Sequence, residues 1–321
     1  MNDDAQLRLM ARIARMYHER GIKQSEIAAE LHVSQPRVSR LLKRAADEGI
    51  VRTVVTLPAG TFTNLEEEIE ARYGMDECVV VDAGEDETTV ENALAAAAAT
   101  YLETTLTGGD VIGLSSWSAT WLAAIERLQP FRTQVASAVV QLFGGIGNPT
   151  VQVKATRMID MLARATGAAP EFFPSPAVLG TPAAAAELRN DPSVIHILEL
   201  LPQVTVALVG IGSLEPSALL RQSGNIFSDA GHEELRAAGA VGDVCLRYFD
   251  ADGAHVDSDF DRRLVGADAD QLRAIPRRVA AAGGKRKHSA IHAALRGGWV
   301  NVLITDAATA RALLDDQSSA A

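Results

Sequence analysis

The stretch Lys23–Ala45, KQSEIAAELHVSQPRVSRLLKRA, predicts two short helices joined by a tight turn. We expect Ser25 to cap the first helix and Ser34 to cap the second. Pro36 then falls in the first turn of the second helix, where its missing N–H costs nothing. Ala28 is small at the position where the two helices must approach closely. Helix, turn and helix at this spacing form a helix-turn-helix motif.

Apolar residues around this motif predict a small three-helix core. They recur at helical spacing over about residues 4–20, which predicts a further helix that Gly21 ends. Gly49 ends the last helix, and the following IVRTVVTL is typical of a strand, either a wing or a lead into a linker near residues 58–63. The inward-facing positions of the motif are Ile27, Ala28, Leu31, Val38, Leu41, Leu42 and Ala45.

The outward face of the last helix is polar and basic. Near its start, Gln35 could pair with adenine and Arg37 with guanine, whereas Arg40, Lys43 and Arg44 suit phosphates. A small bundle with a solvated basic face is the simpler alternative. The caps, the small residue and the apolar stripe all agree with a domain that binds double-stranded operator DNA. The predicted DNA-binding residues are Ser34, Gln35, Arg37, Ser39, Arg40, Lys43 and Arg44.

Charge separates this segment from the rest of the chain. Residues 1–58 hold ten basic and seven acidic residues, a net charge of +3. Because the whole chain has a net charge of −11, the remaining residues carry −14. An acidic body repels DNA, so binding must be confined to the basic end. Together with a length of 321 residues, this predicts a DNA-binding domain over 1–57 and a larger domain over 58–321.

Composition limits the class of protein. No apolar run approaches the ~18 residues of a membrane span, and the acidic start MNDDAQLRLM is unlike a secretory signal. Cys78 and Cys245 each lie in a strand-like apolar run, which predicts two buried thiols in a reduced cytoplasmic protein. We expect no disulfide, no metal site and no cofactor.

The larger domain alternates strands and helices. Because several strands are apolar along their whole length, we expect an α/β fold with a mostly parallel sheet that helices cover on both faces. The predicted strands include ECVVVD, GDVIGLS, VASAVVQL, VTVALVGIGS, VGDVCLRYFD, PRRVAAAGG and NVLITD.

Four predicted strands are followed by loops rich in glycine and hydroxyl groups. Ligands of such sheets bind at the carboxyl ends of the strands, so these loops predict a site for a small polar or anionic ligand. Glycine also serves ordinary turns, the run KRKH at 285–288 could be a solvated charge cluster, and the tryptophans could pack rather than stack on a ligand. The candidate residues are Ser115, Ser116, Trp117, Ser118 and Thr120, then Gly144, Gly145 and Gly147, then Gly210 and Gly212, then Gly284, Lys285 and Lys287.

Several longer motifs carry a resemblance to a known family. They are VVQLFGGIG, FFPSPAVLGT, LVGIGSLEP, GDVCLRYFDADG and AAGGKRKHSAIHAALRGGWVNVLITDAATA. With the helix-turn-helix before them, the chain resembles the SorC family of bacterial sugar-responsive transcriptional regulators over nearly its whole length.

The resemblance implies a fold related to sugar-phosphate isomerases and glucosamine-phosphate deaminases. It also implies homo-oligomers, usually tetramers, and a sugar, sugar-phosphate or polyol effector that controls genes of carbohydrate or polyol catabolism. The GGxxK pattern places Lys287 to face a phosphate, and Asp250 falls in an acidic segment that could accept hydrogen bonds from ligand hydroxyls. Phe143 stands where many members have a polar residue.

The alternative is an enzyme of the isomerase or deaminase type with a DNA-binding head. Sugar-phosphate isomerisation needs a general base over the substrate carbon. No histidine or carboxylate lies within the four glycine-rich loops. The sequence therefore favours a regulator without catalytic activity.

Overall fold

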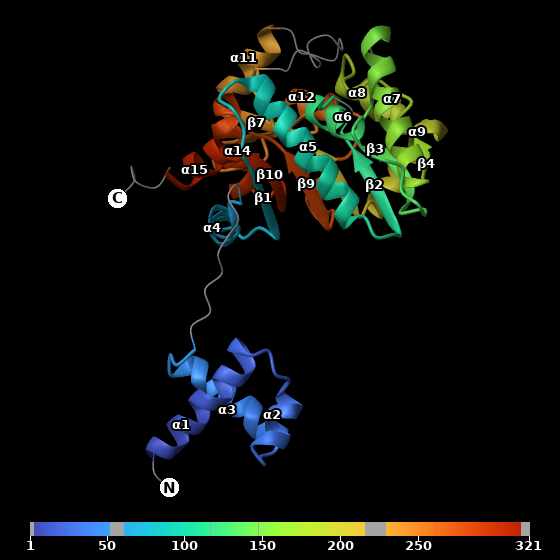
Figure 1. Ribbon diagram of the computed structural model, residues 1–321. Coiled ribbons are helices and arrows are strands. Elements are labelled where there is room, and N and C mark those ends of the chain that lie inside the picture. Colours follow the sequence, from blue (N-terminus) through green and yellow to red (C-terminus); the bar gives the residue numbers. More distant parts are fainter. Residues whose placement is uncertain (1–2, 52–60, 116, 147, 216–228, 316–321) are drawn as a thin grey trace. The chain divides into compact units, whose positions relative to one another are not determined.

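The computed structural model describes residues 3–51, 61–115, 117–146, 148–215 and 229–315. The chain divides into two compact units, residues 1–58 and 59–321 (Figure 1). Each unit is described by itself.

The first unit is a three-helix domain. Its elements are α1 (Asp3–Ala14) with a π-helical turn η1 (Arg15–Glu19), α2 (Gln24–Glu30) and α3 (Gln35–Asp47). The predicted inward positions are buried, except that Leu31 is partly exposed, and Met10 and Ile13 of α1 complete the core. His32 lies in the turn with φ 51°, and Gly49, with φ 72°, follows the end of α3. The helix-turn-helix is therefore confirmed.

Two details of this unit differ from the prediction. Lys23, not Ser25, is the N-cap of α2, because the Lys23 carbonyl accepts the first helical bonds from the N–H groups of Glu26 and Ile27. Ser34 is the N-cap of α3, but its side chain makes no capping hydrogen bond. The strand expected after Gly49 covers residues 50–57, of which 52–57 lie outside the described residues.

The second unit alternates strands and helices along the sequence. Its strands are β1 (Glu77–Val81), β2 (Asp110–Leu114), β3 (Ala136–Gln141), β4 (Ala169–Glu171), β5 (Val206–Val209), β6 (Gly212–Ser213), β7 (Ala240–Val244), β8 (Arg247–Asp250), β9 (Arg277–Ala281) and β10 (Val302–Asp306). Its helices are α4 (Thr63–Tyr73), α5 (Glu87–Thr105), α6 (Ala119–Ile125), α7 (Pro149–Thr166), α8 (Pro182–Leu188), α9 (Pro192–Leu200), η2 (Leu201–Gln203), α11 (Asp229–Ala237), α12 (Asp259–Arg263), α13 (Ala269–Ala274), η3 (Lys285–Lys287), α14 (His288–Arg296) and α15 (Ala307–Asp315).

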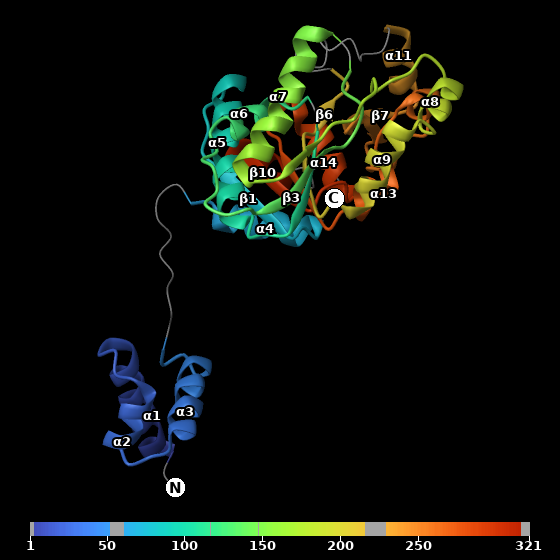
Figure 2. The same ribbon diagram turned by 90° about the vertical axis from the view of Figure 1, so that its right-hand side faces the viewer.

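Within the described residues, seven strands form one parallel sheet in the order β1-β10-β9-β5-β2-β3-β4. Both faces are buried, as the apolar strands predict. In β5, Val206 and Leu208 join one core cluster, whereas Ala207 and Val209 join the other. Helices α5, α6 and α7 cover the first face (Figure 2). Helices α9, α14 and α15 contribute to the core on the second face.

A second sheet corrects the reading of VGDVCLRYFD as one strand. The segment is a hairpin of β7 and β8, which pairs antiparallel with β6 in a three-stranded sheet. Cys245 and Leu246 form its turn with φ of 54° and 63°, so Cys245 lies in a turn and not in a strand. The Asp243 carboxylate accepts the N–H of Leu246 at 2.8 Å, which helps to hold this reversal.

No helix in the described parts of the chain is both long and apolar enough to cross a membrane.

Candidate functional site

A cavity of about 600 Å³ lies where the strand order of the large sheet reverses. From β2 the chain continues to β3 and β4 on one side, and then returns through β5 to β9 and β10 on the other. The carboxyl ends of β2 and β5 therefore open a crevice between them, the usual ligand position in such sheets. The indole Nε1–H of Trp121 donates to the Val209 carbonyl at 2.7 Å and ties α6 to the end of β5.

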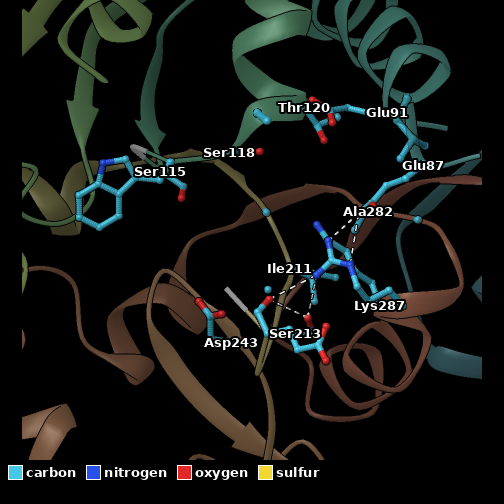
Figure 3. A pocket seen from close by; sticks show the side chains of 18 of the residues that line it. Glu87, Glu91, Ser115, Ser118, Thr120, Ile211, Ser213, Asp243, Ala282 and Lys287 are labelled. Atoms are coloured by element: carbon cyan, nitrogen blue, oxygen red, sulfur yellow. Dashed lines mark hydrogen bonds and ion pairs between the residues drawn. The ribbon is translucent and has the colours of Figure 1, made fainter. Parts of the chain in front are cut away.

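Segments from both sheets line the cavity. They are the start of α5, the segment from β2 into α6, Phe143 two residues after β3, the segment from β5 into β6, the β7–β8 turn, and the loop between β9 and α14. The volume suits a small-molecule ligand. Its polar lining side chains are Glu87, Thr88, Glu91, Ser115, Ser118, Thr120, Ser213, Glu215, Asp243, Arg286 and Lys287 (Figure 3).

Two cations come from the loop after β9. Arg286 bridges separate parts of the wall: its Nη2 lies 2.6 Å from Glu87 Oε1, and its Nη1 lies 3.3 Å from Ser213 Oγ (Figure 3). The hydrogen bond from Arg286 to Glu87 and the charge of the guanidinium group lower the pKa of Glu87. Burial, helped by the charge of Arg286, lowers the pKa of Lys287, whereas Asp243 opposes that shift.

Asp243 is a buried carboxyl group that lines the same cavity. Burial raises its pKa from the usual 3.8 to about 6, although the N–H of Leu246 and the charge of Lys287 act in the opposite direction. A carboxyl group with such a pKa can exchange a proton near neutral pH. Asp243 and Lys287 thus give the cavity an acidic and a basic group that influence each other.

The β7–β8 turn holds an uncommon backbone conformation beside Asp243. Cys245 and Leu246 both line the cavity, and both have positive φ although neither is glycine. A non-glycine residue in this region costs of order 1–3 kcal/mol and is found often at ligand sites. The burial of both side chains and the bond from Leu246 to Asp243 offset this cost.

Trp117 and Phe143 form an aromatic part of the wall. Their rings meet edge to face, with centroids 5.1 Å apart. The Trp117 Nε1–H is buried and has no hydrogen-bond partner among the described residues. Phe143 packs its ring against Trp117 and offers no polar group to a ligand in the cavity.

The fold brings seven predicted ligand residues to the cavity, from the segments that follow three strands, β2, β5 and β9. They are Ser115, Trp117, Ser118, Thr120, Gly210, Gly212 and Lys287. Ser118 also caps α6 by accepting the N–H of Trp121 at 3.3 Å. Ser116 and Gly147 lie outside the described residues.

Five other predicted residues lie outside the described cavity lining. Gly144 is pressed against the backbone of Ser175 and Pro176, and Gly145 against the amide of Gln141, so both glycines serve close packing. Asp250 turns away to accept the N–H groups of Asp252 and Ala254. The remaining two, Gly284 and Lys285, belong to the segment after β9. The Gly284 N–H donates to Asp306 and Thr309, and Lys285 is exposed.

Sequence reasoning missed Glu87, Glu91, Asp243 and Arg286. The two glutamates could have been found, because they begin the helix after β1, and β1 ends at the same edge of the sheet as the other parallel strands. Arg286 stands between Lys285 and Lys287, in a loop whose composition already predicted an anion site. Asp243 carried no signal, since it lies inside an apolar run and reaches the cavity only through the hairpin.

The described residues contain no group of three or more His, Cys, Asp or Glu side chains that could hold a metal ion.

The exposed face of α3 forms a second candidate site in the first unit. Arg44 pairs with Glu48, and the Arg40 Nε–H donates to the Pro36 carbonyl at 3.3 Å. Both contacts run along the helix surface and leave the side chains on its outer face. All seven predicted DNA-binding residues are exposed: Ser34, Gln35, Arg37, Ser39, Arg40, Lys43 and Arg44.

Comparisons with known proteins match both units. Residues 2–57 match the family of the helix-turn-helix domain, and residues 58–315 match the family described as "Putative sugar-binding domain". The deoxyribonucleoside regulator of Bacillus subtilis (strain 168) is 34% identical over 98% of this chain and 99% of its own.

A second relative is similar in both sequence and structure. The sorbitol operon regulator of Klebsiella pneumoniae is 29% identical over 98% of this chain and 100% of its own. The crystal structure of full-length SorC from Klebsiella pneumoniae superposes with a TM-score of 0.72 at 27% identity, over 98% of this chain and 100% of that one. With both domains matched and relatives named as transcriptional regulators, the chain belongs to the SorC family of transcriptional regulators.

Proposed function

We propose that this regulator binds operator DNA through residues 1–57 and is controlled by a small polyhydroxylated effector bound in the cavity of residues 58–321. The effector is a sugar, a sugar phosphate or a polyol, and the controlled genes serve its catabolism. The names of the relatives support this class, since one is a sorbitol operon regulator and another a deoxyribonucleoside regulator.

The composition of the cavity wall carries this proposal. Carboxylates and hydroxyls suit the hydroxyl groups of a sugar or polyol, and Lys287 and Arg286 suit a phosphate. Hydrophobic side chains, among them Trp117 and Leu246, complete the wall. Of the predicted ligand residues, we propose that Ser115, Ser118, Thr120 and Lys287 contact the effector, together with Asp243.

On the DNA, we propose that α3 enters the major groove, so that Gln35 and Arg37 contact base edges while Arg40, Lys43 and Arg44 contact phosphates. The exposure of these side chains on one helix supports this arrangement.

The test measures effector and DNA together. Calorimetry of the full chain with 2-deoxyribose, sorbitol and their phosphate esters finds the effector class, and fluorescence anisotropy follows binding to DNA from upstream of the gene. We expect one compound to bind and to change the DNA affinity, because a ligand shifts an equilibrium only through unequal affinity for its two states. A compound that binds without changing DNA affinity would contradict the proposal.

We further propose that the protein is not an enzyme. The absence of carboxylates from the glycine-rich loops no longer supports this, because the fold brings Asp243, Glu87 and Glu91 to the cavity from other segments. Support comes instead from the helix-turn-helix domain and from relatives named as regulators. Turnover of pentose or amino-sugar phosphates by the purified protein would overturn it.

We also propose that it acts in the cytoplasm as a homo-oligomer, with the tetramer implied by the family resemblance, and that residues 58–321 carry the oligomer contacts.

A further inference from the structure

Asp306 is a buried carboxylate behind the loop that carries the two cations of the cavity. It is the last residue of β10 and is 3% exposed. The loop, Ala282–Lys287, begins where the neighbouring strand β9 ends. Its residues Ala282, Gly283, Arg286 and Lys287 line the cavity, whereas Asp306 contacts the loop without being part of the described cavity lining.

Asp306 and Thr309 hold this loop through one backbone group. The Gly284 N–H donates to Asp306 Oδ2 at 2.9 Å and to Thr309 Oγ1 at 2.8 Å. The Thr309 hydroxyl in turn donates to Asp306 Oδ2 at 2.6 Å, and the Thr309 N–H donates to Asp306 Oδ1 at 2.9 Å. Oδ2 thus accepts from both the loop and the Thr309 hydroxyl, whereas Oδ1 accepts from the backbone of the first turn of α15.

The loop sequence fits this support. A side chain on Gly283 would collide with Asp306 Oδ2, so only glycine lets the loop lie against the carboxylate. Gly284 has φ 89° and ψ 149°, a conformation that other residues rarely adopt. Such a loop needs an outside contact to keep one conformation, and the bonds from Gly284 supply it.

We propose that Asp306 and Thr309 are positioning residues that fix the loop so that Arg286 and Lys287 face the effector. This rests on the proposed function, because it assigns a role within the same cavity. Residues that orient a ligand contact commonly matter nearly as much as the contact itself.

The first measurement is hydrogen exchange of the loop in the full chain without ligand. Thr309→Val removes the hydroxyl at nearly constant shape, and Asp306→Asn puts an amide where two oxygens accept hydrogen bonds. We expect faster exchange of the amides of residues 283–287 in both variants. Thr309→Ser keeps the hydroxyl group, so the loop amides of this control variant should exchange as slowly as in the unmodified protein.

The second measurement is calorimetric affinity for whichever of 2-deoxyribose 5-phosphate, sorbitol 6-phosphate and inorganic phosphate binds the unmodified protein most tightly. We expect Asp306→Asn and Thr309→Val to weaken binding roughly 5- to 100-fold, the range for a buried group that loses its partner. Thr309→Ser should bind like the unmodified protein.

The chain offers a matched control at the opposite edge of the sheet. Asp110, the first residue of β2, accepts the Thr205 hydroxyl at 2.8 Å, and that hydroxyl accepts the N–H of Val111 at 3.1 Å. Thr205→Val should reduce stability without changing exchange of the loop. Equal acceleration of loop exchange in Thr205→Val and Thr309→Val would overturn the positioning role, because the effect would then be global.

Failure of this inference can be told from failure of the proposed function. If Lys287→Ala weakens binding while Asp306→Asn and Thr309→Val bind normally, the positioning role is overturned and the effector site stands. If no compound binds the unmodified protein, the proposed effector class is overturned. Loop exchange then decides the positioning role alone, and unchanged exchange in both variants overturns it.

Discussion

Lys285 and Lys287 stand two positions apart in a basic run, yet the fold gives them different surroundings. Lys285 is exposed and lies outside the described cavity lining, whereas Lys287 lines the cavity beside Asp243. The 3-10 turn that contains both residues separates their directions. Composition alone could not distinguish them.

This difference predicts unequal effects of two alanine substitutions. Lys287→Ala should weaken the binding of a phosphorylated effector by about 1.5–3 kcal/mol, because it removes a charge-assisted hydrogen bond. Lys285→Ala is the control and should leave the affinity nearly unchanged. Calorimetric titration measures both. Equal losses in the two variants would mean that general charge, rather than a direct contact, attracts the ligand.

Asp243 predicts a pH dependence of folding. Because burial raises its pKa to about 6, the folded chain keeps this proton up to about pH 6, whereas the unfolded chain releases it near pH 4. The folded state therefore binds more protons between these values, and the free energy of unfolding falls as the pH rises through them. A shift of this size corresponds to roughly 3 kcal/mol.

Asp243→Asn should remove this fall, since the amide does not titrate. Urea denaturation at several pH values between 4 and 7, followed by tryptophan fluorescence, makes the comparison; all three tryptophans lie in the second unit. Asp250→Asn, in the same hairpin, is the control and should retain the fall. Parallel stability curves for Asp243→Asn and the unmodified protein would contradict the assignment.

At the scale of elements, α3 combines a buried stripe with an exposed basic face. Arg37→Ala should cost roughly 1–3 kcal/mol of operator affinity and relax discrimination at one base pair. Lys43→Ala should weaken binding to all sequences and reduce the salt dependence by about one counterion, because it removes a phosphate contact. Anisotropy with operator and scrambled DNA at several salt concentrations separates the two effects. Unchanged operator affinity in both variants would exclude α3 as the recognition helix.

For the whole molecule, the charge distribution opposes tight binding of DNA by a single copy of the chain. A single helix-turn-helix makes few base contacts, and the remainder of the chain carries a net charge of −14. Two or more DNA-binding units on one site raise the affinity without any new contact. Sedimentation of the full chain at micromolar concentration should therefore show an oligomer. A monomer with and without DNA would contradict this prediction.

The sequence by itself determined the helix-turn-helix, the parallel sheet and the edge of that sheet where the cavity lies. These follow from local patterns: apolar spacing at Ile27, Val38 and Leu41 selects a helix, and apolar runs such as VALV select strands buried on both faces. The rule that ligands meet the carboxyl ends of strands then predicted a site in the loops that hold Ser115 and Lys287, and both residues line the cavity.

Only the tertiary structure decided which side chains share the cavity. Asp243 reaches it through a hairpin whose turn uses two non-glycine residues with positive φ, and no local pattern predicts such a turn. Gly144 and Gly284 matched the pattern of a ligand loop, yet they serve close packing and the support of a loop. A glycine in the sequence indicates that the backbone either turns sharply or lies close to another group. Contacts between residues distant in sequence determine whether that group is a ligand or another part of the protein.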